Sequence, residues 1–236
     1  GITCEVLSTE EVDGKPLIEN VLDIVDQKGT GKDTVISALE NGIVVSTITE
    51  AVNARFISSM GKTRAKISKN KKVIKERNNL SIKDKKIAVQ SLKGGLYCSN
   101  VVSIIQGLKL IKEVSKANSW NIEISRVLEA WAHGRIIQSK VLKDINNSLK
   151  TSSLNEILVK EFSRSRIKDL INVISLAAHN QIPLPVHSAV MSYFQALSSS
   201  NLPANLIQLQ RDYFGSHGFE KKTARGKLSH LNGDKK

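Results

Sequence analysis

The sequence predicts an all-α protein, and three observations support this fold class. Proline and glycine are sparse in the middle of the chain, and convincing strand alternation is rare. Aromatic residues make up only 4% of the chain, so leucine, isoleucine, valine and alanine must fill the core. Apolar residues recur at helical spacing, most clearly in one stripe: Val101, Ile104, Ile105, Leu108, Ile111 and Val114.

The first third of the chain is punctuated by glycine and proline. Proline favours the first turn of a helix, and glycine or asparagine favours its end. On these signals we expect a turn at Asp13-Gly14, a helix over 16–26, a glycine-bearing break over 27–32, a helix over 34–40 ended by Asn41-Gly42, and a helix over 45–60. The polar, basic residues 61–80 predict a loop joined to an exposed helix.

Longer helical patterns dominate the rest of the chain. The stripe predicts a long helix that ends at Asn118-Ser119. After it we expect helices over 122–148, 153–161 and 165–180, an extended connector over 181–185, helices over 186–198 and 204–213, and an extended or mobile tail over 221–236. The stretches 45–60 and 186–198 each follow an apolar connector, a weak sign of internal helical duplication. We therefore predict one helical domain over 1–218 and a basic tail over 219–236.

Length and composition exclude several protein classes. A chain of 236 residues can bury a core without a disulfide or metal staple. Cys4 and Cys98 are interpreted as buried free thiols, and no Cys/His spacing resembles a zinc site. No run of 18 apolar residues exists, and residues 1–20 lack the pattern of a signal peptide. We therefore expect a cytoplasmic protein with no metal ion and no contact with a membrane.

Positive charge is concentrated in one stretch of the chain. The formal net charge is +13, and residues 61–93 contain twelve basic and two acidic residues. Such a cluster can bind nucleic acid or another anionic surface. It can equally be a solvated lysine-rich face, which the absence of aromatic residues from 61–93 favours.

Two segments carry candidate anion ligands. Lys28 lies in the sequence Gln-Lys-Gly-Thr-Gly-Lys at a helix start, where glycines and a helix N-terminus favour a phosphate; a simple turn between helices is the alternative. The loop departs from the Walker pattern at Asp26 and Asp33. Arg55 lies within an apolar-striped helix and could face a pocket or form a salt bridge with Glu50.

The densest polar and aromatic cluster lies near the end of the chain. Arg211 could hold a phosphate or carboxylate with two hydrogen bonds, and His217 could donate one or hold a proton. The alternative is a helix end capped by Gly215. Residues alone supply no complete catalytic set, so this reasoning stops at a basic helical domain with anion-binding features.

Several segments, in order and at similar spacing, resemble the C-terminal all-helical domain of 6-phosphogluconate dehydrogenase. The resemblance runs from about residue 2 to His217, and its last block is the most specific. The segments are Asp13-Gly14-Lys15-Pro16-Leu17, Gln27-Lys28-Gly29-Thr30-Gly31-Lys32, Ile36-Ser37-Ala38-Leu39, Glu50-Ala51-Val52-Asn53-Ala54-Arg55, Leu96-Tyr97-Cys98-Ser99, and the block from Leu202-Pro203-Ala204-Asn205 to Arg211-Asp212-Tyr213-Phe214-Gly215-Ser216-His217.

The resemblance implies a function. The family enzyme oxidises and decarboxylates 6-phosphogluconate with NADP, yielding ribulose 5-phosphate and carbon dioxide in the pentose phosphate pathway, and is a homodimer. It implies that Lys28 and Arg55 bind the substrate phosphate. It also implies that Arg211 and His217 reach the neighbouring subunit's site, Arg211 toward the phosphate and His217 toward the sugar-acid chain. Residues 1–218 would then be a substrate-binding and dimerisation domain.

The resemblance also implies what this chain lacks. The family's dinucleotide-binding domain, with its catalytic lysine and glutamate, precedes the helical domain. We therefore expect no catalytic residue in this chain, NADP bound mainly by the N-terminal domain, and no activity of the isolated chain. The alternative is a non-catalytic basic helical domain that binds nucleic acid or other polyanions. A related β-hydroxyacid dehydrogenase is a further alternative, but its substrates often lack the phosphate that Lys28 and Arg211 suit.

Overall fold

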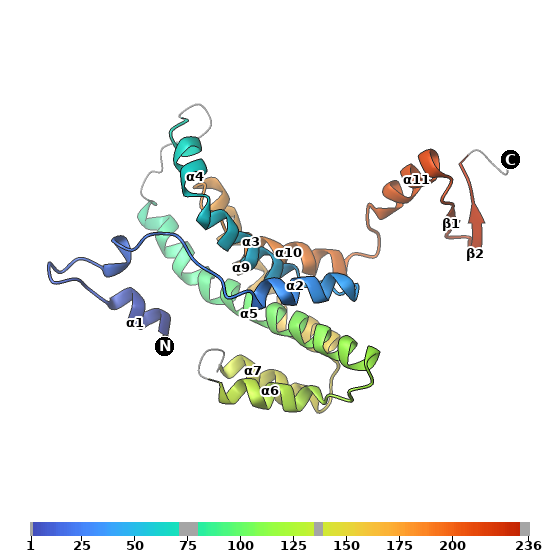
Figure 1. Cartoon of the computed structure of the whole chain (residues 1–236), viewed down its shortest axis with the longest axis horizontal. Coiled ribbons are helices and arrows are strands. Elements are labelled where there is room, and N and C mark those ends of the chain that lie inside the picture. The colour runs from blue at the N-terminus through green and yellow to red at the C-terminus, as the bar shows by residue number, and fades with distance from the viewer. Residues whose placement is uncertain (1, 71–79, 135–138, 232–236) are drawn as a thin grey trace. The chain divides into compact units, whose positions relative to one another are not determined.

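The computed structural model describes residues 2–70, 80–134 and 139–231 (Figure 1). Eleven α-helices, a short 3-10 helix and two strands follow one another in these residues. The described structure is therefore predominantly helical, which confirms the predicted fold class. The chain divides into two compact units, Gly1–Met191 and Ser192–Lys236, and each is described by itself. The predicted division at 218/219 and the predicted duplication stay predictions.

The N-terminal segment has less helix than predicted. It contains α1 (Ile2–Ser8), a turn with Gly14 at φ +78°, and the 3-10 helix η1 (Leu17–Glu19). The turn at Asp13-Gly14 is confirmed, but the helix predicted over 16–26 is wrong beyond η1. Side chains hold the backbone after η1 in another conformation: Arg64 binds both carboxylate oxygens of Asp23, at 2.6 and 2.8 Å, and the Val25 N–H donates to Ser58 Oγ at 3.1 Å.

The next two helices confirm the predicted elements, except that the first begins at Thr30, inside the break predicted over 27–32. They are α2 (Thr30–Glu40), which ends at Asn41-Gly42, and α3 (Ser46–Ser59). Ala38, Val45 and Leu110 form a buried apolar cluster that joins these helices to α5 (Ile82–Ala117). Thr47 and Gln106 are also buried, and the Gln106 side-chain oxygen accepts hydrogen bonds from the Thr47 hydroxyl at 2.7 Å and the Thr47 N–H at 3.1 Å.

The centre of the first unit is α5 (Ile82–Ala117), which contains the predicted apolar stripe (Figure 1). It starts at Ser81, whose hydroxyl accepts the Asp84 N–H at 3.1 Å. It ends where predicted, and Ser119 follows at φ +56°. The helix α9 (Arg164–His179) packs along α5. Val101, Val102, Ile105 and Leu108 of α5 are completely buried, so this helix runs through the core of the unit.

Besides α9, the first unit contains four shorter helices, and α10 begins in it. They are α4 (Gly61–Ser68), α6 (Ile124–His133), α7 (Lys140–Leu149) and α8 (Leu154–Glu161), with α10 at Pro185–Ser198. The single helix predicted over 122–148 is therefore wrong. Gly134 is extended, and the Ser139 hydroxyl starts a new helix by accepting the Leu142 N–H at 3.4 Å. The extended connector expected over 181–185 is confirmed as a break between helices over 182–184, but Gln181 is a turn residue at φ +54° and Pro185 already belongs to α10.

The second unit contains the end of α10, the helix α11 (Ala204–Gly215) and a hairpin. Its antiparallel strands are β1 (Phe219–Lys221) and β2 (Ala224–Ser229), with Phe219 opposite Ser229 and a bulge between Glu220 and Lys221. The described part of the tail predicted as extended or mobile, up to residue 231, is largely extended, but it is paired in a hairpin that was not predicted. Contacts from α11, described below, hold this hairpin.

The two cysteines differ in environment. Neither forms a disulfide. The prediction of buried thiols is confirmed for Cys98 and wrong for Cys4, which is exposed. Burial raises the pKa of the Cys98 thiol to about 11, so it stays protonated near neutral pH.

Candidate functional site

The loop that ends at Gly29 leads directly into α2 and carries Lys28. Gly29 occupies the left-handed region at φ +94°, which favours glycine, and its carbonyl accepts the Asp33 N–H at 2.9 Å. Gly29 is the N-cap residue of α2, and no side chain there accepts a hydrogen bond from the first turn of the helix. Lys28 is exposed, so its charge and the helix N-terminus both face solvent from this loop.

The second predicted ligand, Arg55, lies on α3, three residues after a residue that contacts the first turn of α2. Gly31 packs against Val52 of α3, where an added Cβ would lie 3.0 Å from the Val52 Cγ2. Lys28 precedes this contact by three residues, and Arg55 follows it by three. The contact therefore brings together the two segments that carry the predicted phosphate ligands of the first unit.

Two arginines of the first unit have structural partners. Arg64 is paired with Asp23, and its guanidinium holds the pKa of that carboxyl below its usual value. Arg166 donates to Glu161 at 2.8 Å and lies 4.1 Å above the Tyr97 ring. Lys28, Arg55 and Arg211 are outside the ion pairs of the described residues, a property that they share with other exposed cations such as Arg225.

The salt bridge considered for Arg55 is not formed in the described part of the chain. Glu50 instead accepts a hydrogen bond from Asn53 Nδ2, at 3.4 Å. Arg55 is exposed on α3. Its guanidinium is thus available to an anion.

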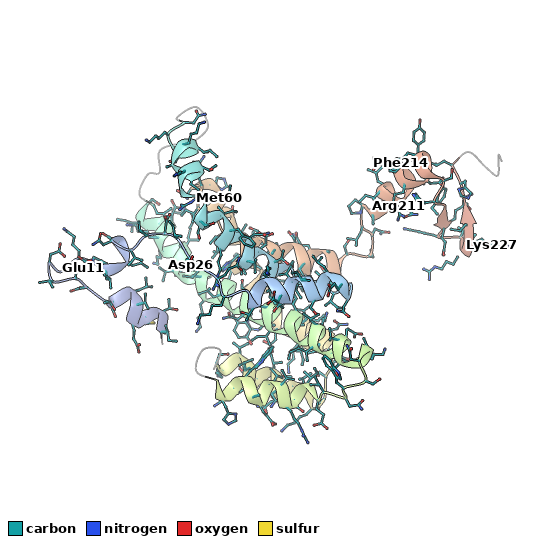
Figure 2. The ribbon with its side chains drawn as sticks, in the orientation of Figure 1. Glu11, Asp26, Met60, Arg211, Phe214 and Lys227 are labelled. Atoms are coloured by element: carbon teal, nitrogen blue, oxygen red, sulfur yellow. The ribbon has the colours of Figure 1, made fainter. Side chains whose placement is uncertain are left out.

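The second unit contains the other two predicted ligands (Figure 2). Arg211 is exposed on α11, and its Nη1 donates to Gln208 Oε1 at 3.4 Å. His217 is also exposed, just beyond the helix. The proposed cap at Gly215 is wrong: Gly215 is the last helical residue, and Ser216 takes the left-handed conformation at φ +49°.

Asp212 is the residue whose role the sequence did not predict. Its side chain is only 2% exposed, although its neighbours Arg211 and Tyr213 face solvent. Its carboxylate accepts the backbone N–H of Leu231 at 2.8 Å, which contributes most to a pKa below the usual value. An acid between two exposed residues gives no sign of burial in sequence, because its partners lie in the hairpin up to nineteen residues away.

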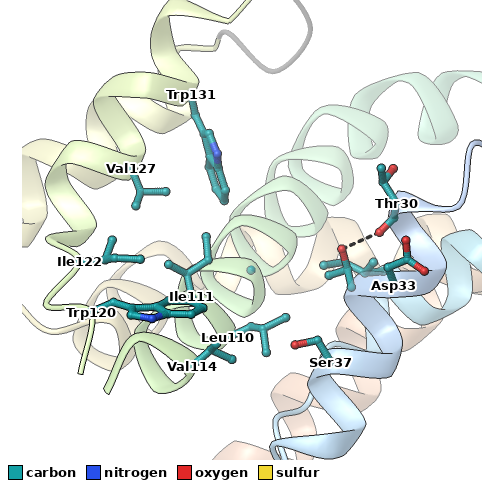
Figure 3. Close-up of a pocket in the computed structure, with 13 residues that line it drawn as sticks. Thr30, Asp33, Ser37, Leu110, Ile111, Val114, Trp120, Ile122, Val127 and Trp131 are labelled. Carbon is teal, nitrogen blue, oxygen red and sulfur yellow. Dashed lines mark hydrogen bonds between the residues drawn. The ribbon is translucent and has the colours of Figure 1, made fainter. Parts of the chain in front are cut away.

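A largely apolar pocket of about 770 Å³ lies between α2, α5 and α6 (Figure 3). One wall carries Trp120, Val127 and Trp131, while the α2 wall carries Asp33 and Ser37. None of the four predicted ligands lines it. Its apolar lining and its carboxylate do not suit a phosphate dianion, so this pocket and the predicted anion site are different places.

The basic stretch is described only in part. Its lysines on α4 and the first turns of α5 are exposed, and residues 71–79 lie outside the described residues. The described residues show no group of three acids, histidines or cysteines that could hold a metal ion. Among the helices described, none is long and apolar enough to cross a membrane.

Comparisons with known proteins identify relatives along almost the whole chain. The family model described as 6-phosphogluconate dehydrogenase, C-terminal domain, matches residues 1–232. The decarboxylating 6-phosphogluconate dehydrogenase of Treponema pallidum is 33% identical over 240 residues, which cover 98% of this chain and 49% of the relative. That of Schizosaccharomyces pombe is 40% identical over 223 residues, covering 92% and 45%.

A solved structure is also similar. Plasmodium falciparum 6-phosphogluconate dehydrogenase, solved alone, with its cofactor NADP+ and with its substrate 6-phosphogluconate, matches with a TM-score of 0.88 and 32% identity. The match covers 97% of this chain and 50% of that one. This chain thus spans about half the length of the curated relatives it matches.

Proposed function

The chain belongs to the 6-phosphogluconate dehydrogenase family, as its C-terminal domain, and from this premise we propose that it binds substrate phosphate and forms the dimer in the full-length enzyme. That enzyme would oxidise and decarboxylate 6-phosphogluconate with NADP, yielding ribulose 5-phosphate and carbon dioxide. The observation that carries the proposal is the contact of Gly31 with Val52, which brings together the segments of two exposed cations, Lys28 and Arg55. Arg211 is a third exposed cation, on α11.

A phosphate dianion suits such a set of cations. Arginine and lysine form charge-assisted hydrogen bonds with phosphate oxygens, and several cations together balance its charge. We assign Lys28 and Arg55 to one subunit's site. Arg211 of the neighbouring subunit would complete the phosphate site, and His217 would donate a hydrogen bond to the sugar-acid chain.

Exposed apolar side chains in the second unit support the proposed homodimer. Leu206, Ile207 and Phe214 of α11 are 59%, 59% and 74% exposed. Contiguous apolar surface of this kind marks a protein interface. A second copy of the chain is the partner that would also bring Arg211 and His217 to another subunit's site.

NADP is assigned mainly to the N-terminal domain of the full-length enzyme. The described residues form helices and one hairpin, without the parallel strand and glycine-rich loop that hold a dinucleotide. They do not fit the cofactor, and no step assigned to this chain involves it. The isolated chain, mixed with 6-phosphogluconate and NADP, should therefore yield no NADPH. We assign no catalytic residue and no metal ion to this chain, and its cytoplasmic location stays a prediction.

Steady-state kinetics of the full-length enzyme test the phosphate site. Arg211→Ala should raise the KM for 6-phosphogluconate roughly 10- to 100-fold, since a hydrogen bond between charged groups contributes about 1.5–3 kcal/mol. Arg225→Ala removes the same charge from an exposed position on β2 and should change this KM less than about twofold. Equal KM values for Arg211→Ala and wild type would overturn the assignment.

Mixed dimers test whether Arg211 acts across the interface. One subunit carries Lys28→Ala and Arg55→Ala, the other carries Arg211→Ala, and two different tags isolate the heterodimer. Activity is measured at a 6-phosphogluconate concentration well below the raised KM. If Arg211 serves the neighbouring site, one site of the heterodimer is intact, and about half of the wild-type activity returns. If it serves its own subunit, both sites bind substrate weakly, and the activity stays close to that of the Arg211→Ala homodimer.

A further inference from the structure

The backbone next to His217 is held on both sides by side chains of α11. The N–H of Gly218 donates to Asp212 Oδ1 at 2.7 Å, and the carbonyl of Gly218 accepts from Gln208 Nε2 at 2.6 Å. Gln208 and Asp212 are four residues apart, so they lie on one face of the helix. Gly218 is buried and takes φ +74°, a conformation that favours glycine.

The same carboxylate also holds the far end of the hairpin. Asp212 Oδ1 lies 2.7 Å from His230 Nδ1, and Oδ2 accepts the Leu231 N–H at 2.8 Å. Three partners from two segments thus surround one buried carboxylate. A buried charge is stable only while such partners are in place, so Asp212 ties α11, the residue after His217 and the end of β2 together.

The imidazole of His217 itself rests against the end of α11. A Cβ added at Gly215 would lie 2.6 Å from His217 Nε2 and 2.8 Å from its Cδ2. Real Cβ atoms do not approach other atoms this closely, so the ring can occupy this place only because residue 215 has no side chain. The position of the imidazole therefore depends on the absence of a Cβ at residue 215.

We propose that Asp212, Gln208 and Gly215 are positioning residues that set the place of His217 at the substrate site. Asp212 and Gln208 hold the backbone that follows His217, and Gly215 leaves room for its ring. This inference rests on the proposed function, because His217 is a substrate ligand only there. None of the three positioning residues needs to touch the substrate.

Asp212→Asn in the full-length enzyme is the first test. The amide keeps the shape of the carboxylate but replaces one acceptor oxygen with a donor, so three partners no longer find enough acceptors. The KM for 6-phosphogluconate should rise about fivefold or more, while kcat changes less than about twofold. Glu220→Gln is the matched control: Glu220 accepts the Gly226 N–H at 3.0 Å within the same hairpin but is exposed, and its KM should stay within about twofold of wild type.

Gly215→Ala is the second variant, because it disturbs the ring without touching the carboxylate. Alanine favours a helix more than glycine does, so this variant should fold even if Asp212→Asn does not. It should raise the same KM by a similar factor. An unchanged KM for Gly215→Ala would overturn the role assigned to Gly215, and unchanged values for both variants would overturn the whole inference.

A double-mutant cycle separates positioning from general support of the tail. If Asp212 acts through His217, then Asp212→Asn adds nothing to the KM of a His217→Ala enzyme. If it only stabilises the hairpin, the two effects multiply, and the inference is wrong. His217→Ala alone tests the proposed function, because an unchanged KM for this variant would refute the role of His217. If His217→Ala raises the KM while Asp212→Asn and Gly215→Ala leave it unchanged, only the inference is refuted.

Discussion

The two units of this chain keep their structure by opposite means. In the first, α5 buries Val101, Ile105 and Leu108 completely. In the second, Asp212 and Gly218 are the buried residues among those described, while Leu206, Ile207 and Phe214 of α11 are exposed. The first unit is thus stabilised by its own apolar core, and the second by hydrogen bonds to one carboxylate.

This difference indicates what each unit needs from its surroundings. Burial of apolar surface is the main favourable term in folding, and the first unit buries apolar side chains in its own core. The second unit leaves that surface available to a partner. The first unit presents Lys28 and Arg55, and the second unit presents Arg211 and His217. This distribution matches the division of roles that we propose.

Substitutions in the core of the first unit should have the largest effect on the free energy of unfolding. Leu108→Ala should lower the free energy of unfolding of the chain by about 2–5 kcal/mol, because it leaves a cavity in a fully buried site. Leu39→Ala removes the same atoms from a side chain that is 75% exposed and should cost less than about 1 kcal/mol. Urea unfolding followed by circular dichroism measures both, and equal losses would break the comparison.

The close packing of α5 on α9 should give the next largest effect. At Gly94 an added Cβ would lie 2.7 Å from the Asp169 Cβ, so Gly94→Ala must push the helices apart and cost roughly 1–3 kcal/mol. At Gly107 of the same helix the nearest atom, in Trp131, would be 3.5 Å away. Gly107→Ala should therefore stabilise the chain by up to about 1 kcal/mol. Thermal unfolding of both variants should shift the midpoint in opposite directions.

A tyrosine from each unit sharpens the comparison at high pH. Burial and the hydrogen bond to Glu161, at 2.6 Å, raise the pKa of Tyr97 to about 12, whereas Tyr213 is 77% exposed. Unfolded tyrosine ionises near pH 10, so the contribution of Tyr97 to stability is complete below about pH 10 and is lost as the pH rises toward 12.

Tyr97→Phe should make the loss of stability between about pH 10 and 12 less steep, and cost about 1 kcal/mol near neutral pH through the missing hydrogen bond. Tyr213→Phe is the control and should leave both quantities unchanged. Ultraviolet titration should lose the transition near pH 12 in Tyr97→Phe. A titration curve unaltered at high pH would show that Tyr97 is not the shifted group.

The exposed face of α11 should give the smallest effect on stability and a clear effect on assembly. We expect the chain to be a dimer at micromolar concentration. Leu206→Ser with Phe214→Ser should shift it toward monomer, while the stability of the monomer changes by less than about 0.5 kcal/mol. Light scattering measures the mass, and Lys227→Ser on the hairpin is the control. A doubly substituted chain that stays dimeric would place the interface elsewhere.

Helical period and end signals predicted most of the first unit from sequence. The end of α2 at Asn41-Gly42 and the end of α5 at Asn118 are local events that residue identity controls. The helix predicted over 16–26 failed because Arg64 binds Asp23 from 41 residues away. A pattern in neighbouring residues cannot indicate such a long-range contact.

The candidate site was predictable as a set of residues but not as an arrangement. Lys28, Arg55, Arg211 and His217 were recognised through a resemblance that runs along the chain. Which cations lack carboxylate partners could not be read from it: Glu50 lies five residues before Arg55 yet bonds Asn53. The burial of Asp212 likewise depends on contacts with Leu231, which only the folded hairpin provides.

The sequence by itself determined the helical fold class, most helix boundaries and the family, because periodicity, capping residues and ordered motifs are properties of neighbouring residues. Tertiary structure decided what distant residues do to each other. It folded the basic tail into a hairpin around Asp212, brought Gly31 against Val52, and placed the His217 ring over Gly215. These outcomes depend on contacts between segments, whose free energies appear only once the chain has folded.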